Sequence, residues 1–196
     1  MVTAPDGSTT NPFTPKVPRN REIDLSSLIA AVPDYPKPGI LFKDITPLLA
    51  NGDALTLAID LLAEFFSVTE SDAIAGIEAR GFILGAAVAS ALGIGFIPLR
   101  KPGKSPRPVH TVRYALEYGE DELQVHRHLL APGMRIGIID DVLATGGTAA
   151  AGIELIEKAQ SDPVGFACLL ELGALGGRER LAKRDANLPI HALIVQ

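Results

Sequence analysis

Apolar residues in this chain gather in short runs, separated by segments with a helical spacing. After Gly147, small and aliphatic residues recur at spacings of three and four, which predicts a helix with one buried face; residues 52–66 follow the same spacing. The apolar runs, which have the length of interior strands, are residues 73–77, 94–99, 135–140, 164–172 and 190–195. Apolar strands that alternate with amphipathic helices are typical of a parallel sheet covered on both faces. The pattern therefore predicts an α/β fold with a parallel sheet flanked by helices.

The longest uncharged stretch, residues 81–99, needs separate treatment because its length could span a bilayer. Gly93 and Gly95 interrupt it, and Pro98 lies near its end. We predict instead a buried helix from about Gly81 to Leu92, followed by a strand from Ile94 to Leu99. No membrane interaction is expected.

Two regions depart from this alternation. Residues 100–133 are polar and contain alternating stretches, which predicts a long loop and a hairpin inserted into the α/β frame. Residues 1–22 carry four prolines among polar residues and are expected to form a flexible arm. The remaining residues, 23–196, are expected to form a single domain.

Composition narrows the class of protein. The chain has 196 residues, of which 47% are hydrophobic and 21% charged, as in ordinary globular domains. A formal net charge of −5 argues against a nucleic-acid-binding surface. The single cysteine, Cys168, allows no disulfide framework within the chain, and no secretory signal is recognisable. A cytoplasmic location is therefore expected.

Charged and glycine-rich residues follow three of the predicted strands. Asp140 and Asp141 end one strand, "EARG" (78–81) follows another and "RKPGK" (100–104) a third. In open parallel sheets, ligands bind beyond the carboxyl ends of the strands. We expect these residues to meet at one edge of the sheet.

The turn over residues 144–148, Ala-Thr-Gly-Gly-Thr, leads directly into a predicted helix. Free amides at a helix start attract anions, and glycine lets the backbone approach a phosphate closely; a plain capped turn is the alternative. Neither a Walker A loop nor a dinucleotide fingerprint is present. Asp140 and Asp141 would repel phosphate, so they should face ribose hydroxyls or Mg²⁺. Together these features predict a site for a ribose 5-phosphate group.

A basic cluster is formed by Arg100, Lys101, Lys104 and Arg107, with no acid among residues 99–109. In an acidic protein this cluster indicates an anion site, although a solvated basic loop is the simpler interpretation. Pro102 and Gly103 belong to a loop able to move over a site and exclude water.

Five stretches resemble motifs of the type I phosphoribosyltransferases in the expected order. They are "VPDYPKPGILFKDITPLL" (32–49), "IEARGFILG" (77–85), "IPLRKPGK" (97–104), "YALEYG" (114–119) and "DDVLATGGT" (140–148). The resemblance covers nearly all of residues 23–182 and is closest to the members that use adenine. It implies a hood over about 23–50 and a mobile loop over about 100–116.

The resemblance implies a reaction and its partners. The expected activity is transfer of phosphoribose from phosphoribosyl diphosphate to adenine, giving AMP and pyrophosphate in purine salvage. Mg²⁺ would act as cofactor, held mainly by the substrate and without direct protein ligands. A homodimer is also implied.

Site residues carry over by position. The resemblance assigns the ribose 5-phosphate to Asp140, Asp141, Ala144, Thr145, Gly146, Gly147 and Thr148. It assigns pyrophosphate to Glu78, Ala79, Arg80, Arg100, Lys101 and Lys104, with a non-proline cis peptide on one side or the other of Ala79. It assigns adenine to Leu41, Phe42 and Lys43. Glu117 is the implied acid/base residue, and Arg80 is the second catalytic candidate.

Three alternatives stay open. Another purine could be the acceptor, although the 6-oxopurine members have Asp where Ala144 stands and usually Lys where Gly147 stands. A purine-operon repressor would need a DNA-binding domain that the short segment before Ile23 does not provide. A non-catalytic sensor of phosphoribosyl diphosphate or AMP is the third.

Overall fold

A five-stranded parallel sheet forms the centre of the molecule in the computed structural model, which describes residues 23–115 and 120–196. The strand order is β4-β3-β7-β8-β9, and every neighbouring pair is parallel. The strands are β3 (Ala73–Ile77), β4 (Gly95–Leu99), β7 (Arg135–Leu143), β8 (Asp162–Glu171) and β9 (Ile190–Val195). The predicted α/β fold with a flanked parallel sheet is confirmed.

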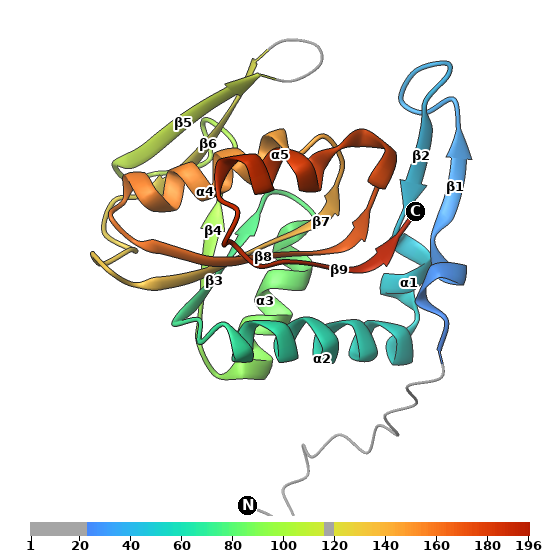
Figure 1. The fold of residues 1–196 in the computed structure, drawn as a ribbon, viewed down its shortest axis with the longest axis horizontal. Helices are drawn as coiled ribbons and strands as arrows, with labels where there is room; N and C mark the ends of the chain where they lie inside the picture. The colour runs from blue at the N-terminus through green and yellow to red at the C-terminus, as the bar shows by residue number, and fades with distance from the viewer. Residues whose placement is uncertain (1–22, 116–119) are drawn as a thin grey trace, which may run out of the picture.

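Helices cover both faces of the sheet (Figure 1). On one side lie α2 (Gly52–Val68) and α3 (Gly81–Leu92), and on the other α4 (Gly147–Lys158) and α5 (Gly177–Arg184). Successive residues of a strand point to opposite faces, so Ile138 joins the α4 side of the core while Ile139 joins the α2 and α3 side. Strands buried on both faces explain the unbroken apolar runs in the sequence.

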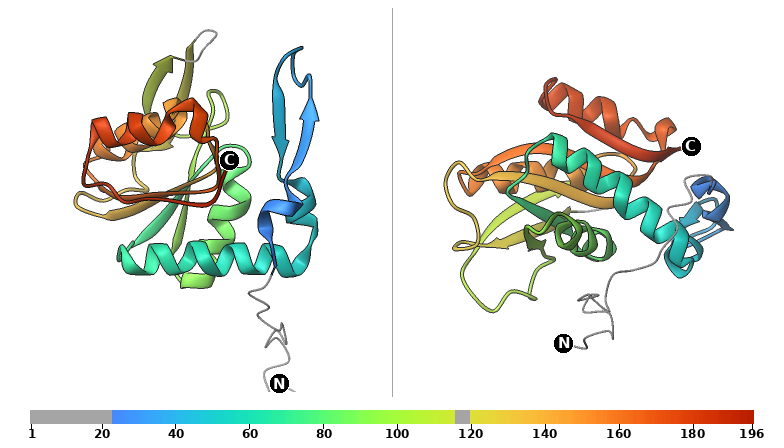
Figure 2. Two further views of the ribbon diagram at one scale, coloured as in Figure 1. Left: turned by 45° about the vertical axis from the view of Figure 1, so that its right-hand side comes forward. Right: turned by 90° about the horizontal axis from the view of Figure 1, so that it is seen from below.

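Two smaller units flank this frame. Near the N-terminus, the 3-10 turn η1 (Leu25–Leu28) precedes the antiparallel pair β1 (Ala30–Pro33) and β2 (Leu41–Asp44), and α1 (Thr46–Ala50) follows. This pair projects beside the sheet (Figure 2). The second unit is the antiparallel hairpin of β5 (Val109–Ala115) and β6 (Glu120–His126), whose buried Val112 and Leu123 belong to the α4 side of the core.

The element bounds differ little from those expected. The uncharged stretch forms α3 over Gly81–Leu92 as predicted, and the strand after it begins at Gly95 instead of Ile94. Among the described residues, no helix is long and apolar enough to cross a membrane. Strand β7 was expected to end at residue 140, but its pairing with β8 continues to Leu143, so Asp140 and Asp141 lie inside the strand. The expected arm over residues 1–22 lies outside the described residues.

Candidate active site

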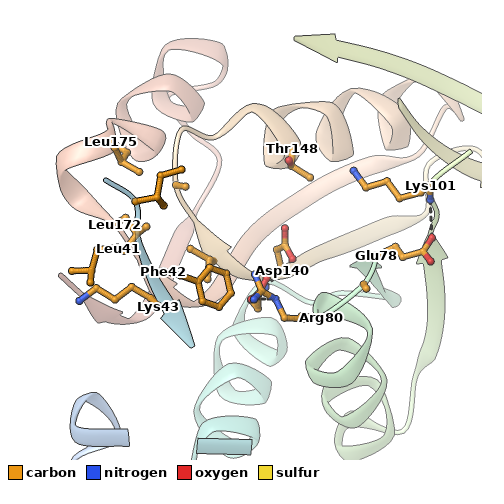
Figure 3. A pocket seen from close by; sticks show the side chains of 15 residues that line it. Leu41, Phe42, Lys43, Glu78, Arg80, Lys101, Asp140, Thr148, Leu172 and Leu175 are labelled. Carbon is orange, nitrogen blue, oxygen red and sulfur yellow. Dashed lines mark hydrogen bonds and ion pairs between the residues drawn. The ribbon is translucent and has the colours of Figure 1, made fainter. Parts of the chain in front are cut away.

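A cavity of about 460 Å³ opens at the carboxyl ends of β3 and β7 (Figure 3). Its walls come from β2, the loops after β3 and β4, the end of β7, the start of α4 and the loop after β8. The predicted site residues that line it are Leu41, Phe42, Lys43, Glu78, Ala79, Arg80, Lys101, Asp140, Asp141, Ala144 and Thr148. Three segments far apart in the sequence thus meet at one cavity, as the strand-end argument predicted.

The turn over residues 144–148 has a backbone suited to an anion. Gly146 precedes α4 with a left-handed φ of 75°, a conformation that favours glycine. The turn surrounds a small hollow of about 60 Å³, lined also by Thr145, Gly147 and Thr148. Because the first amides of α4 have no partner within the helix, this hollow can hold a phosphate group.

The two aspartates of β7 contact each other directly. The backbone N–H of Asp141 donates to Oδ1 of Asp140 at 2.9 Å. Burial raises the pKa of Asp140 well above its usual range, and the adjacent charge of Asp141 adds to this rise. Burial also raises the pKa of Asp141, although Arg80 opposes the shift. Two desolvated acids facing a cavity indicate a site for hydroxyl groups or a cation and exclude an anion beside them.

Arg80 connects the acids to the aromatic part of the cavity. Its Nε lies 2.6 Å from Oδ2 of Asp141, and its guanidinium carbon lies 5.2 Å from the ring centroid of Phe42. The peptide bond between Glu78 and Ala79 is cis, which is one of the two positions expected. The guanidinium therefore lies between the aromatic ring and a buried carboxylate.

The basic loop is not a free cluster of charge. Lys104 Nζ lies 2.8 Å from Oε1 of Glu78, and the backbone N–H of Lys101 donates to Oε2 of the same residue at 2.8 Å. Burial alone would raise the pKa of Glu78, but these partners and Arg100 hold it below the usual value. Arg100 and Lys104 are thus attached to the cavity wall through Glu78, although neither is among the residues that line the cavity. Three of the four cations in the predicted cluster thus have carboxylate partners, whereas Arg107 is exposed.

Lys101 has a second set of partners on the β5–β6 hairpin. Its Nζ donates to the hydroxyl of Tyr114 at 2.7 Å and forms an ion pair with Asp121. Burial lowers the pKa of Lys101, but these partners outweigh it and the pKa is raised overall. The hydroxyl of Tyr114 lies 3.5 Å from Oγ1 of Thr148, so the hairpin, the basic loop and the phosphate turn are in contact.

One side of the cavity is apolar. Phe42 contacts Tyr35 edge to face, with ring centroids 5.1 Å apart. Four lining residues that the sequence did not single out are Ile40, Val142, Leu172 and Leu175. Leu172 and Leu175 follow β8, so applying the strand-end argument to the run 164–172 would have found them. An apolar wall that includes an aromatic ring suits a heteroaromatic base.

Two further expectations concern Glu117 and a metal ion. Glu117, the implied acid/base residue, lies outside the described residues. No group of three or more His, Cys, Asp or Glu side chains is placed to hold a metal ion within residues 23–115 and 120–196.

Comparison with known proteins places this site in a class. A family model described as the phosphoribosyl transferase domain matches residues 45–189. The match includes the turn that precedes α4, the two aspartates of β7 and the basic loop. The fold is therefore that of a phosphoribosyltransferase, and most of the cavity lining lies within the matched residues.

Individual relatives are more specific. The adenine phosphoribosyltransferase of Thermosynechococcus vestitus is 53% identical over 172 residues, covering 88% of this chain and 99% of the relative. The crystal structure of adenine phosphoribosyltransferase from Rhodothermus marinus superposes with a TM-score of 0.82 at 48% identity, covering 88% and 96% of the two chains. The Giardia lamblia enzyme complexed with 9-deazaadenine has a TM-score of 0.83 at 37% identity, covering 88% and 96%. The chain belongs to the adenine phosphoribosyltransferase family.

Proposed function

We propose that this protein transfers the 5-phosphoribosyl group from phosphoribosyl diphosphate to adenine, releasing AMP and pyrophosphate. One observation carries the proposal: an anion-binding turn, a half-buried and a buried aspartate, and an aromatic wall surround a 460 Å³ cavity and the small hollow that adjoins it. Phosphate, sugar diol and base are the three parts of AMP. A cavity of this volume lies within the usual range for small-molecule sites.

The roles of the residues follow from their placement. The turn over residues 144–148 holds the 5-phosphate, and Asp140 and Asp141 accept hydrogen bonds from the ribose hydroxyls. Phe42 stacks on adenine, while backbone groups of Leu41 and Lys43 read its amino edge. The loop 78–80 and the basic loop hold pyrophosphate, with Lys101 nearest to the cavity.

The reaction breaks the bond between ribose C1 and the pyrophosphate oxygen, and the bonding electrons leave with pyrophosphate. N9 of adenine forms the new bond to C1 and loses its proton to Glu117. Positive charge develops on the ribose during this exchange, and the carboxylates of Asp140 and Asp141 stabilise it. The cations of the basic loop stabilise the departing anion, and closure of this loop excludes water from the reactive centre.

A magnesium ion fits this donor set when the substrate supplies most of its ligands. Mg²⁺ in proteins is commonly bound by one or two carboxylates together with substrate phosphates. Asp140 lines the cavity as a half-buried residue, whereas the buried Asp141 is paired with Arg80. When bound, the ion would neutralise charge on the diphosphate and activate it as a leaving group.

The proposal extends to the location, the oligomeric state and the domain division of the protein. The enzyme acts in the cytoplasm, in keeping with its single buried cysteine. It functions as a homodimer, as the resemblance to its family implies. Its chain is divided into an arm over residues 1–22 and one catalytic domain over 23–196, with the mobile loop at about 100–116.

A purified-protein assay tests the function. Adenine, hypoxanthine, guanine and xanthine are supplied separately with phosphoribosyl diphosphate, with and without Mg²⁺, and release of pyrophosphate is measured. Adenine alone should support rapid, magnesium-dependent turnover. Turnover with a 6-oxopurine would make another purine the acceptor, whereas AMP binding without turnover would indicate a sensor.

A further inference from the structure

The segment from Glu171 to Arg178 touches two different parts of the cavity. Leu172 and Leu175 line the apolar side (Figure 3), while Gly177 lies against the phosphate turn. The segment joins β8 to α5 and contains only the short turn η2 (Gly173–Leu175). Backbone bonds hold its first residues, because Leu172 N–H donates to Leu143 and Gly173 N–H donates to Gln196, but they do not reach Gly177 at its other end.

The two ends of the segment are joined by an ion pair. Arg178 donates from Nε and Nη2 to the carboxylate of Glu171, at 3.0 and 2.5 Å, and from Nη1 to the carbonyl of Ile190 at 2.9 Å. Glu171 is only 5% exposed. A two-pronged guanidinium–carboxylate contact fixes orientation as well as distance. The pair therefore ties the start of α5 to both β8 and the beginning of β9.

The contact between α5 and the phosphate turn leaves no spare space. A Cβ on Gly146 would lie 2.8 Å from the carbonyl oxygen of Gly177, and a Cβ on Gly177 would collide with the carbonyl oxygen of Ala144. Leu172 N–H also donates to the carbonyl of Leu143, at 2.9 Å, just before the turn. A shift of this segment would therefore displace the phosphate turn.

We infer that the Glu171–Arg178 pair is a positioning element that sets the phosphate turn and the base-binding wall relative to each other. The inference rests on the proposed function, because it concerns the same cavity. Arg178 acts on the phosphate side through Gly177, and Glu171 acts on the base side through the adjoining Leu172. Loosening the pair alters the spacing between both parts of a bound nucleotide.

Substitution of Arg178 tests this inference. In Arg178→Gln we expect KM to rise about tenfold for both adenine and phosphoribosyl diphosphate, since misplacement by about 1 Å can cost up to ~100-fold. The change in kcat should be smaller, and Arg178→Lys, which keeps the charge but loses the fork, should give an intermediate KM. Arg184→Gln is the matched control, because Arg184 also lies on α5 and pairs with glutamates, Glu154 and Glu157, on the surface of α4.

Two results would overturn the inference. A variant that melts at lower temperature but keeps wild-type KM values at 25 °C would show a purely structural pair and overturn the inference, as would equal KM changes in Arg184→Gln. If Arg178→Gln does not fold, Arg178→Lys and Glu171→Gln take its place, because each weakens the same ion pair, with Arg184→Gln again as the control. A wild-type protein without transferase activity would instead refute the proposed function.

Discussion

Nε of Arg80 lies 2.6 Å from Oδ2 of Asp141. Asp141 is 5% exposed, so this guanidinium supplies the counter-charge of a carboxylate that water hardly reaches. The same guanidinium lies over the ring of Phe42. Any ligand that engages Asp141 or Phe42 therefore also affects Arg80.

The first prediction concerns this pair. In Arg80→Gln the pKa of Asp141 should rise further, because burial then acts without the opposing cation. A carboxyl whose folded pKa exceeds its unfolded value destabilises the fold when ionised. We expect the free energy of unfolding to fall by on the order of 1–3 kcal/mol at pH 8, which is typical of a buried polar group without a partner. The fall should be smaller at pH 5. Thermal melts at pH 5 and pH 8 measure this loss of stability.

Arg113→Gln, at an exposed ion pair with Glu122, is the control for this substitution. A loss of stability that does not depend on pH would contradict the prediction.

Asp140 leads to a second prediction, in which stability and binding change in opposite directions. Burial and the charge of Asp141 raise its pKa, so Asp140→Asn should stabilise the ligand-free protein at pH 7. A rise in Tm of about 2–4 °C corresponds to 1 kcal/mol in a chain of this size. The gain should shrink as the pH falls and the aspartate becomes protonated. Calorimetry should show weaker binding of phosphoribosyl diphosphate. Asp53→Asn, at an exposed acid in the first turn of α2, should not raise Tm.

The third prediction concerns Phe42 and adenine. Stacking of a base on an aromatic ring contributes about 1–3 kcal/mol, so Phe42→Ala should raise KM for adenine by about 5- to 150-fold. KM for phosphoribosyl diphosphate should change less, because Phe42 is connected to the site of that substrate only indirectly, through Arg80. Steady-state kinetics with each substrate varied in turn measures both values. Parallel increases in the two would remove Phe42 from the base site.

Lys101 gives a fourth prediction through its partner Asp121. In Asp121→Asn the ammonium group loses its ion pair on the hairpin and becomes available to the leaving anion. We expect a several-fold lower KM for pyrophosphate in the reverse reaction, in which AMP and pyrophosphate are the substrates. Glu122→Gln removes a neighbouring ion pair on the same strand and should leave this KM unchanged. A higher KM in Asp121→Asn would mean that Asp121 instead holds Lys101 in its binding position.

Glu117 supplies the fifth prediction. Glu117→Gln should reduce kcat by about 10²–10⁴-fold, the usual contribution of general acid–base catalysis. The affinity for AMP, measured by calorimetry, should change little, because the amide keeps the size of the carboxylate. Equal losses in turnover and AMP affinity would assign Glu117 to binding alone.

The sequence predicted the frame of this protein well, because burial on both faces of the sheet leaves a strong signal. Helix α3 begins and ends at the predicted residues. The end of β7 was placed too early because strand length depends on the neighbouring strand: the pairing with β8 continues past the two aspartates to Leu143. Local composition does not contain that information.

The sequence also did not predict the contacts between residues that are far apart along the chain. Lys104 pairs with Glu78 across 26 residues, and Lys101 with Asp121 across 20. The sequence showed a basic loop without acids nearby, and only the fold brings carboxylates to it. Leu172 and Leu175 could have been identified, because the first ends a predicted strand and the second follows it, as do the residues that were chosen.

Strand β7 lies between two cores, and its neighbouring isoleucines, Ile138 and Ile139, face opposite ones. Inserting or deleting one residue within this strand would exchange the side chains that face the two cores along its remaining length and rotate both aspartates away from their positions. Point substitutions at single positions can be accommodated locally, but a change of length cannot. Among related sequences, insertions and deletions should therefore accumulate in the hairpins and be missing from residues 135–143.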